Sequence, residues 1–134
     1  FYNDIYESVR AAKTEIYVSN VDERLFVKTL GDFAKVHVDR IIALKNVTYK
    51  ILIKEGDNYT PGAAYAEYRT IPKELFSSVP FYVYAKKLAI MVFDDEPSII
   101  SLNYPSVAEA YKVQFLDMWN RSSKSQIDNM ITGL

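Results

Sequence analysis

Apolar residues recur at helical spacing in three segments of the chain. In residues 1–12 the stripe consists of Tyr2, Ile5, Val9 and Ala12. The longest stripe spans residues 23–45 and consists of Phe26, Leu30, Phe33, His37, Ile41 and Leu44. A third helix is predicted from Ser106, which with Glu109 matches a capping box, to about Arg121. Its apolar side carries Val107, Tyr111, Phe115 and Met118 or Trp119.

Short runs rich in β-branched and aromatic residues, bounded by turn residues, predict the strands. They cover residues 15–19, 47–53, 65–71, 81–84, 88–93 and 98–102. Asn20 and Asp22 mark a turn after the first run, and Lys86 and Lys87 form the tip of a hairpin. Residues 122–134 are polar and then weakly amphipathic, which fits a short helix, a partner-binding tail or disorder.

The order of these elements predicts the fold class. A strand, a long helix and a second strand form a βαβ unit, whose two strands lie parallel. The later strands are separated only by turns, so we expect them to pair antiparallel. The sequence therefore predicts an α/β fold with a mixed β-sheet flanked by helices.

Composition limits the classes of protein that the chain can represent. At 134 residues it is long enough for one domain and short for two. Its formal net charge of −1 argues against a strongly basic nucleic-acid-binding domain. No apolar run is long enough to span a membrane. The chain begins at Phe1 and not at Met, so we expect a processed N-terminus or a domain cut from a longer cytoplasmic protein.

Few residues offer catalytic or metal-binding chemistry. His37 is the one histidine, and it lies on an apolar stripe. It therefore fits a histidine at the edge of the core better than a general base or a ligand. Without cysteine and with one histidine, a His/Cys zinc site is excluded. Asp94, Asp95 and Glu96 fit a solvated turn better than a Mg²⁺ or Ca²⁺ site, and we expect no metal and no cofactor.

Eleven tyrosines are many for this length, and several lie near the predicted strands. These are Tyr65, Tyr68, Tyr82, Tyr84 and Tyr104. Tyrosine suits ligand pockets and protein interfaces because its large ring carries one polar group. It is also common at half-buried strand positions, so both interpretations stay open.

The hairpin of residues 81–96 and the strand that follows it resemble the phospholipase D-like superfamily. In that superfamily the hairpin carries an HxKxxxxD motif, and a later strand end supplies a Ser-x-Asn pair. Here Tyr84-Ala85-Lys86 stands where His-x-Lys would be, and Ser101-Leu102-Asn103 stands where Ser-x-Asn would be. The resemblance implies a phospholipase D-like half-domain.

Two departures from the motif concern activity. Tyr84 takes the position of the nucleophilic histidine, and Met91 takes that of the acid. Loss of a catalytic nucleophile typically removes on the order of 10⁴–10⁶ of the rate. We therefore expect that the chain is not an enzyme. The alternative is a divergent phosphodiesterase that uses Lys86 with His37 or with a residue from a partner subunit.

Two further segments make the chain similar to the phospholipase D-like domain of TrmB-type transcriptional regulators. They are Arg69-Thr-Ile-Pro72 and the helix Ala108–Trp119. The resemblance covers residues 1–121 and leaves residues 122–134 as a C-terminal tail. In that family a winged helix-turn-helix binds DNA, while this domain serves dimer formation or effector sensing.

The resemblance implies a non-catalytic effector-sensing or dimerisation domain, a fragment that lacks its DNA-binding domain. A homodimer and a sugar or phosphate-bearing effector are expected, with DNA bound only through the other domain and no membrane. The hypothetical ligand-binding residues are Arg69, Tyr84, Lys86, Ser101 and Asn103. Alternatively, Arg69 pairs with Glu67, and Ser101 and Asn103 cap the last helix. A protein-interaction module without a small ligand is a further alternative.

Overall fold

The computed structural model describes residues 1–12, 15–22, 28, 32–44, 47–60, 62–77, 79–94 and 98–124. Its helices are α1 (Tyr2–Ala12), α3 (Asp32–Leu44) and α4 (Pro105–Arg121). Its strands are β1 (Ile16–Val21), β2 (Tyr49–Lys54), β3 (Ala66–Ile71), β4 (Phe81–Tyr84), β5 (Lys87–Val92), β6 (Ser98–Leu102) and β7 (Ser123–Lys124).

These strands form a single mixed sheet in the order β6-β5-β4-β1-β2-β3-β7. β1, β2 and β3 pair in parallel, while β4, β5 and β6 join the other side of β1 as an antiparallel group. The parallel strands come from the N-terminal half of the chain and the antiparallel group from the C-terminal half. The predicted α/β class and mixed sheet are therefore confirmed.

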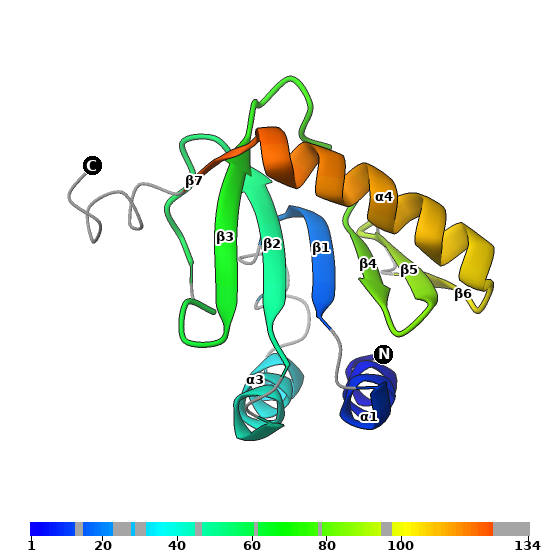
Figure 1. Cartoon of the computed structure of the whole chain (residues 1–134). Coiled ribbons are helices and arrows are strands. Elements are labelled where there is room, and N and C mark those ends of the chain that lie inside the picture. Colours follow the sequence, from blue (N-terminus) through cyan, green and yellow to red (C-terminus); the bar gives the residue numbers. More distant parts are fainter. Residues whose placement is uncertain are drawn as a thin grey trace.

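Helices cover both faces of the sheet (Figure 1). α1 and α3 lie next to each other on one face, and α4 crosses the other. Successive side chains of β2 pack on opposite faces of the sheet. Ile51 and Ile53 belong to the cluster beneath α1 and α3. Leu52 packs on the other face with Phe115 and Trp119 of α4. A central strand buried on both faces in this way reads as a continuous apolar run.

The first strand continues past the predicted turn. Asn20 adopts a φ of 61°, a left-handed value that asparagine tolerates better than most residues. Its side chain bonds the carbonyl of Val79 and the amide of Ser77. These contacts with a distant segment hold Asn20 within β1, whose pairing with β2 is irregular between Val18 and Val21. Of the predicted long helix, residues 23–27, 29–31 and 45 lie outside the described residues.

The last helix begins one residue before the predicted start. Tyr104 is the N-cap residue, and Pro105 occupies the first turn, where the fixed φ of proline favours a helix start. No side chain caps this end, so the predicted capping box of Ser106 and Glu109 is wrong. The alternative that Ser101 and Asn103 cap the helix is wrong for the same reason.

The start of the C-terminal tail belongs to the sheet. Ser123 and Lys124 form β7, which pairs antiparallel with Arg69 and Thr70 of β3. Residues 125–134, to which the other tail interpretations apply, lie outside the described residues. Among the residues that the structure describes, no helix is both long and apolar enough to cross a membrane.

Candidate functional site

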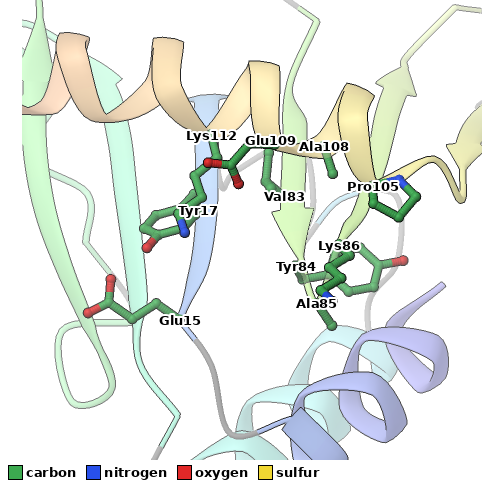
Figure 2. Close-up of a pocket in the computed structure, with 10 residues that line it drawn as sticks. All are labelled: Glu15, Tyr17, Val83, Tyr84, Ala85, Lys86, Pro105, Ala108, Glu109 and Lys112. Carbon is green, nitrogen blue, oxygen red and sulfur yellow. The ribbon is translucent and has the colours of Figure 1, made fainter.

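A pocket of about 240 Å³ lies beneath the first half of α4, at the end of the sheet where β1 begins and β4 ends (Figure 2). Its lining residues are Glu15, Tyr17, Val83, Tyr84, Ala85, Lys86, Pro105, Ala108, Glu109 and Lys112. Apolar side chains from β4 and α4 line part of it, and two acidic and two basic residues complete it. The pocket can therefore enclose a small molecule that carries a polar group.

A two-residue turn between β4 and β5 places Lys86 at the pocket. Ala85 and Lys86 both have positive φ, 45° and 66°, as the favoured two-residue hairpin turns require. Neither residue is glycine, so each left-handed conformation costs about 1 kcal/mol or more. The turn leaves the Lys86 side chain exposed. The predicted hairpin is confirmed, although Lys87 belongs to β5 and not to the turn.

The Tyr84 side chain is buried and its hydroxyl is engaged by α1. The hydroxyl donates to Asp4 Oδ2 at 2.6 Å, and Lys87 Nζ lies 2.9 Å from the other oxygen of the same carboxylate. Burial, and then the Asp4 carboxylate, raise the pKa of Tyr84 far above its usual value. Although burial of Asp4 opposes ionisation, the bonds from Tyr84 and Lys87 lower its pKa. Tyr84 is thus a neutral phenol that donates to a carboxylate.

Tyr17 is the second tyrosine of the pocket. Its ring packs against Phe115 with centroids 5.2 Å apart. Burial raises the pKa of the Tyr17 hydroxyl, and so do the carboxylates of Glu15 and Glu109. In Figure 2 the Tyr17 side chain lies between Glu15 and the α4 residues. Tyr17 therefore stays protonated and supplies a hydroxyl to the pocket.

The charges of the pocket are unevenly compensated. Glu15 is 3.6 Å from Lys50 Nζ, a cation outside the pocket lining that also lies 3.9 Å from Glu67. Lys86 and Lys112 form no ion pair within the described residues. The lining carries two positive charges, on Lys86 and Lys112, and two negative charges, on Glu15 and Glu109, and Lys50 compensates Glu15 in part.

The structure brings together two of the five predicted ligand-binding residues, Tyr84 and Lys86. Ser101 is exposed on β6, Asn103 is exposed after it, and neither lines the pocket. Arg69 lies on β3, away from the pocket lining. The ligand-binding role of this set stays a prediction.

The Arg69 guanidinium is instead held beneath the end of α4. It donates to the Trp119 carbonyl at 2.8 Å and lies 4.6 Å from the centre of the Trp119 ring. Its Nε is 3.7 Å from Glu67, which confirms the ion pair considered as the alternative for Arg69.

Sequence reasoning missed four polar residues of the pocket, namely Glu15, Tyr17, Glu109 and Lys112. Glu109 and Lys112 are three residues apart, a spacing that places both on one helix face. Glu15 and Tyr17 are two apart at the start of β1, and alternate positions share a face of a strand. The two pairs meet only because α4 crosses β1, which local patterns do not show.

His37 and Met91 belong to the core and not to the pocket. The His37 ring stacks on Tyr2 with centroids 4.3 Å apart, and its Nε2 is hydrogen-bonded to the Tyr49 hydroxyl. Burial, followed by the charge of Arg40, lowers the pKa of His37 to about 4. This confirms the interpretation of His37 as a histidine at the edge of the core. Met91 packs in the cluster beneath α1 and α3.

No group of acidic or histidine side chains that could hold a metal ion is found among the described residues. Asp94 is described and exposed, whereas Asp95 and Glu96 lie outside the described residues. The interpretation of these acids as a solvated turn therefore stays a prediction.

The sheet order and the helices on both faces define an α/β protein with a mixed sheet, which agrees with the phospholipase D-like fold that the sequence resemblance predicts. Among solved structures, NucT from Helicobacter pylori matches with a TM-score of 0.61 at 9% identity, covering 91% of this chain and 89% of that chain.

TrmBL2, described as an archaeal chromatin protein with a novel mode of DNA binding, matches with a TM-score of 0.56 at 19% identity. The match covers 91% of this chain and 49% of that chain, so this chain spans about half the length of TrmBL2. No protein-family model and no curated protein matches the sequence. At these identities the likeness to both structures shows the fold alone.

Proposed function

We propose that this chain is a non-catalytic effector-sensing and dimerisation domain of a TrmB-type transcriptional regulator. The likeness to a DNA-binding protein of about twice the matched length supports this proposal. DNA binding would then reside in a part of the regulator outside these 134 residues. The near-neutral charge of the chain agrees with that division of roles.

The proposal that the chain is not an enzyme rests on the burial and hydrogen bonding of Tyr84. A nucleophile at this position needs access to the phosphorus atom and a neighbouring base that takes its proton. The hydroxyl of Tyr84 is instead buried, protonated and bonded to Asp4, a carboxylate whose lowered pKa makes it a weak base. Met91, at the position of the motif acid, has no ionisable group and lies in the core.

The pocket supports a phosphate-bearing effector over a neutral sugar. Lys86 and Lys112 line it from the hairpin turn and from α4, and neither has an acidic partner among the described residues. The Tyr17 hydroxyl is bonded to the Glu15 carboxylate, so the two lysines are the cationic donors of the pocket. Val83, Pro105 and Ala108 offer an apolar wall for the rest of a ligand. Two lysines beside an apolar wall suit a small molecule with one phosphate group.

A thermal-shift titration tests the pocket. We expect inorganic phosphate and nucleoside monophosphates to raise the melting temperature, and an unphosphorylated sugar to leave it unchanged. Lys86→Ala and Lys112→Ala should each remove the shift. Lys73→Ala is the matched control, because Lys73 is exposed and does not line the pocket. A shift that survives both pocket substitutions, or no shift with any probe, would contradict the assignment.

A phosphodiesterase assay tests the second candidate function, which the retained Lys86 and the fold favour. We expect no hydrolysis of a generic phosphodiester above the buffer rate. Hydrolysis that persists through purification and is lost in Lys86→Ala would replace the non-catalytic proposal with a divergent phosphodiesterase. Hydrolysis that is equal in the wild type and in Lys86→Ala would indicate a contaminating enzyme.

A further inference from the structure

The two edges of the sheet differ in how they are protected. At one edge the last strand is β7, which is two residues long and lies beside charged residues of β3. At the other edge the last strand is β6, which has five residues and no charged side chain. Its pairing with β5 is regular along all five residues, without a bulge. Long, uncharged and regular edge strands are those that natural proteins avoid leaving open, because they pair with other strands.

β6 also exposes apolar side chains on both faces of the sheet. Ile100 is 49% exposed and lies opposite Ile90, which packs with the cluster beneath α4. Ile99 is 41% exposed and lies opposite Met91, which packs on the other face. In Figure 1 β6 lies at the border of the sheet, next to the start of α4. Within the described residues, no strand pairs with its outer side.

We propose that β6 is the edge at which two copies of this chain join, by antiparallel pairing of β6 with β6 centred on Ile100. In an antiparallel pair, two residues directly opposite each other either both point their backbone N–H and C=O groups at the partner strand or both point them away. These directions alternate along a strand, so a residue of β6 can lie opposite its own copy or opposite a residue an even number of positions away. Centring on Ile100 is the register of this kind that aligns all five residues. The two-fold axis then runs between the two Ile100 residues, and each copy uses the same surface.

This register brings no like charges together. Ile100 faces Ile100 of the second copy, Ile99 faces Ser101, and Ser98 faces Leu102. Each Ile100 thereby gains an apolar neighbour on the face that α4 covers in part. Cross-strand pairs of β-branched residues stabilise antiparallel sheets, so the exposed isoleucines favour this pairing.

Charge complementarity at the ends of β6 favours a second copy over an unrelated peptide. α4 starts three residues after β6, and its first turn has neither a side-chain cap nor an acidic residue. Pro105 has no amide hydrogen and the amides of Val107 and Ala108 bond the Tyr104 carbonyl, so the Ser106 amide and the helix dipole remain to attract negative charge. In the antiparallel arrangement, Asp94, four residues before β6 in one copy, lies on the side of the start of α4 in the other. Asp94 is exposed and has no cation partner within the described residues.

This inference rests on the proposed function, because it assumes that the chain dimerises, and it assigns the dimer contact to β6. Sedimentation velocity from micromolar to near-millimolar protein tests it, with Ile100→Lys as the variant. Two lysines directly opposite each other repel, so the dissociation constant should rise at least about tenfold. Val113→Lys is the matched control, because Val113 is 58% exposed on α4 and should leave the dimer intact.

A cross-linking experiment fixes the register. The chain has no cysteine, so Ile100→Cys introduces a single thiol. With a short thiol-specific cross-linker, Ile100→Cys should form a covalent dimer in high yield, while Val113→Cys should stay monomeric on the gel. A dimer that survives Ile100→Lys would overturn this surface and leave dimerisation standing. A wild-type chain that is monomeric at every concentration would overturn both.

Discussion

At the residue scale, His37 shows how burial determines the charge of a side chain. It stacks on Tyr2 and is hydrogen-bonded to Tyr49, with its ring inside the layer between α3 and the sheet. Protonation there would place a cation in the core next to Arg40, whose charge also opposes it. The ring is therefore neutral in the folded protein at neutral pH.

The pKa of His37 predicts an acid-sensitive contribution to stability. The folded pKa of about 4 lies below the usual 6.5, so the unfolded chain binds a proton first as the pH falls. The contribution is complete above pH 6.5 and is lost as the pH falls from 6.5 towards 4, by up to about 1.4 kcal/mol per pH unit.

Urea denaturation of the wild type and of His37→Gln across this pH range measures the effect. Glutamine cannot titrate and retains a polar group for Tyr49, so the free energy of unfolding of the variant should fall less steeply with acid. Equal slopes for both proteins would show that His37 does not titrate in this way.

Sequence reasoning succeeded for residues whose role depends on local pattern. His37 could be assigned to the core because it lies on an apolar stripe, and Tyr84 and Lys86 could be placed side by side because they stand two positions apart in one motif. Arg69 was placed in the hypothetical ligand set on the same kind of evidence. Its contact with Trp119, fifty positions away, shows in the folded structure only.

At the element scale, the β4–β5 hairpin combines a regular strand pair with an unfavourable turn. Residues from Phe81 to Tyr84 pair in register with those from Lys87 to Ile90. The turn between them places Ala85 and Lys86 in left-handed conformations that glycine adopts far more readily.

Ala85→Gly should therefore stabilise the protein. Relief of the left-handed conformation is expected to raise the free energy of unfolding by about 1 kcal/mol. Ala110→Gly, in the exposed part of α4, is the control with the opposite sign and should cost about 1 kcal/mol. Both changes are measured by thermal and chemical denaturation. Destabilisation by Ala85→Gly would mean that the turn is not strained.

The boundaries of elements depended on contacts that sequence patterns do not contain. The strands of the hairpin followed from runs rich in β-branched and aromatic residues bounded by turn residues, and their predicted positions agree with β4 and β5 closely. β1 extends through Asn20 because Ser77 and Val79 hold the side chain of that residue. α4 starts at Pro105 because proline suits the first turn, although a capping-box pattern lies one residue later.

At the scale of the whole molecule, Arg69 joins two layers that lie far apart in the sequence. Its guanidinium bonds the carbonyl of Trp119 near the end of α4 and packs on the ring of that residue. The same carbonyl also accepts from the amide and the hydroxyl of Ser122, so Arg69 is one of three donors that meet at this helix end. Arg69 thus attaches the last helix to the third strand of the sheet.

Arg69→Ala should lower the free energy of unfolding by about 2 kcal/mol, the range for a hydrogen bond from a charged donor. Arg121→Ala removes an exposed ion pair with Asp117 and should change stability by less than about 0.5 kcal/mol. Chemical denaturation of the three proteins checks both values. A loss in Arg69→Ala no larger than that in Arg121→Ala would contradict the attachment of α4 by Arg69.

Hydrogen bonds between Asp4 and the hairpin link the pocket to α1, the first helix of the chain. Asp4 of α1 is bonded to Tyr84 and Lys87, the residues on either side of the turn that lines the pocket. A ligand that prefers one position of the turn therefore also prefers one position of α1, without any rearrangement of the sheet. Such coupling is reciprocal, so a partner that binds α1 and favours one of its positions changes the ligand affinity of the pocket by the same free energy by which the ligand changes the affinity for that partner.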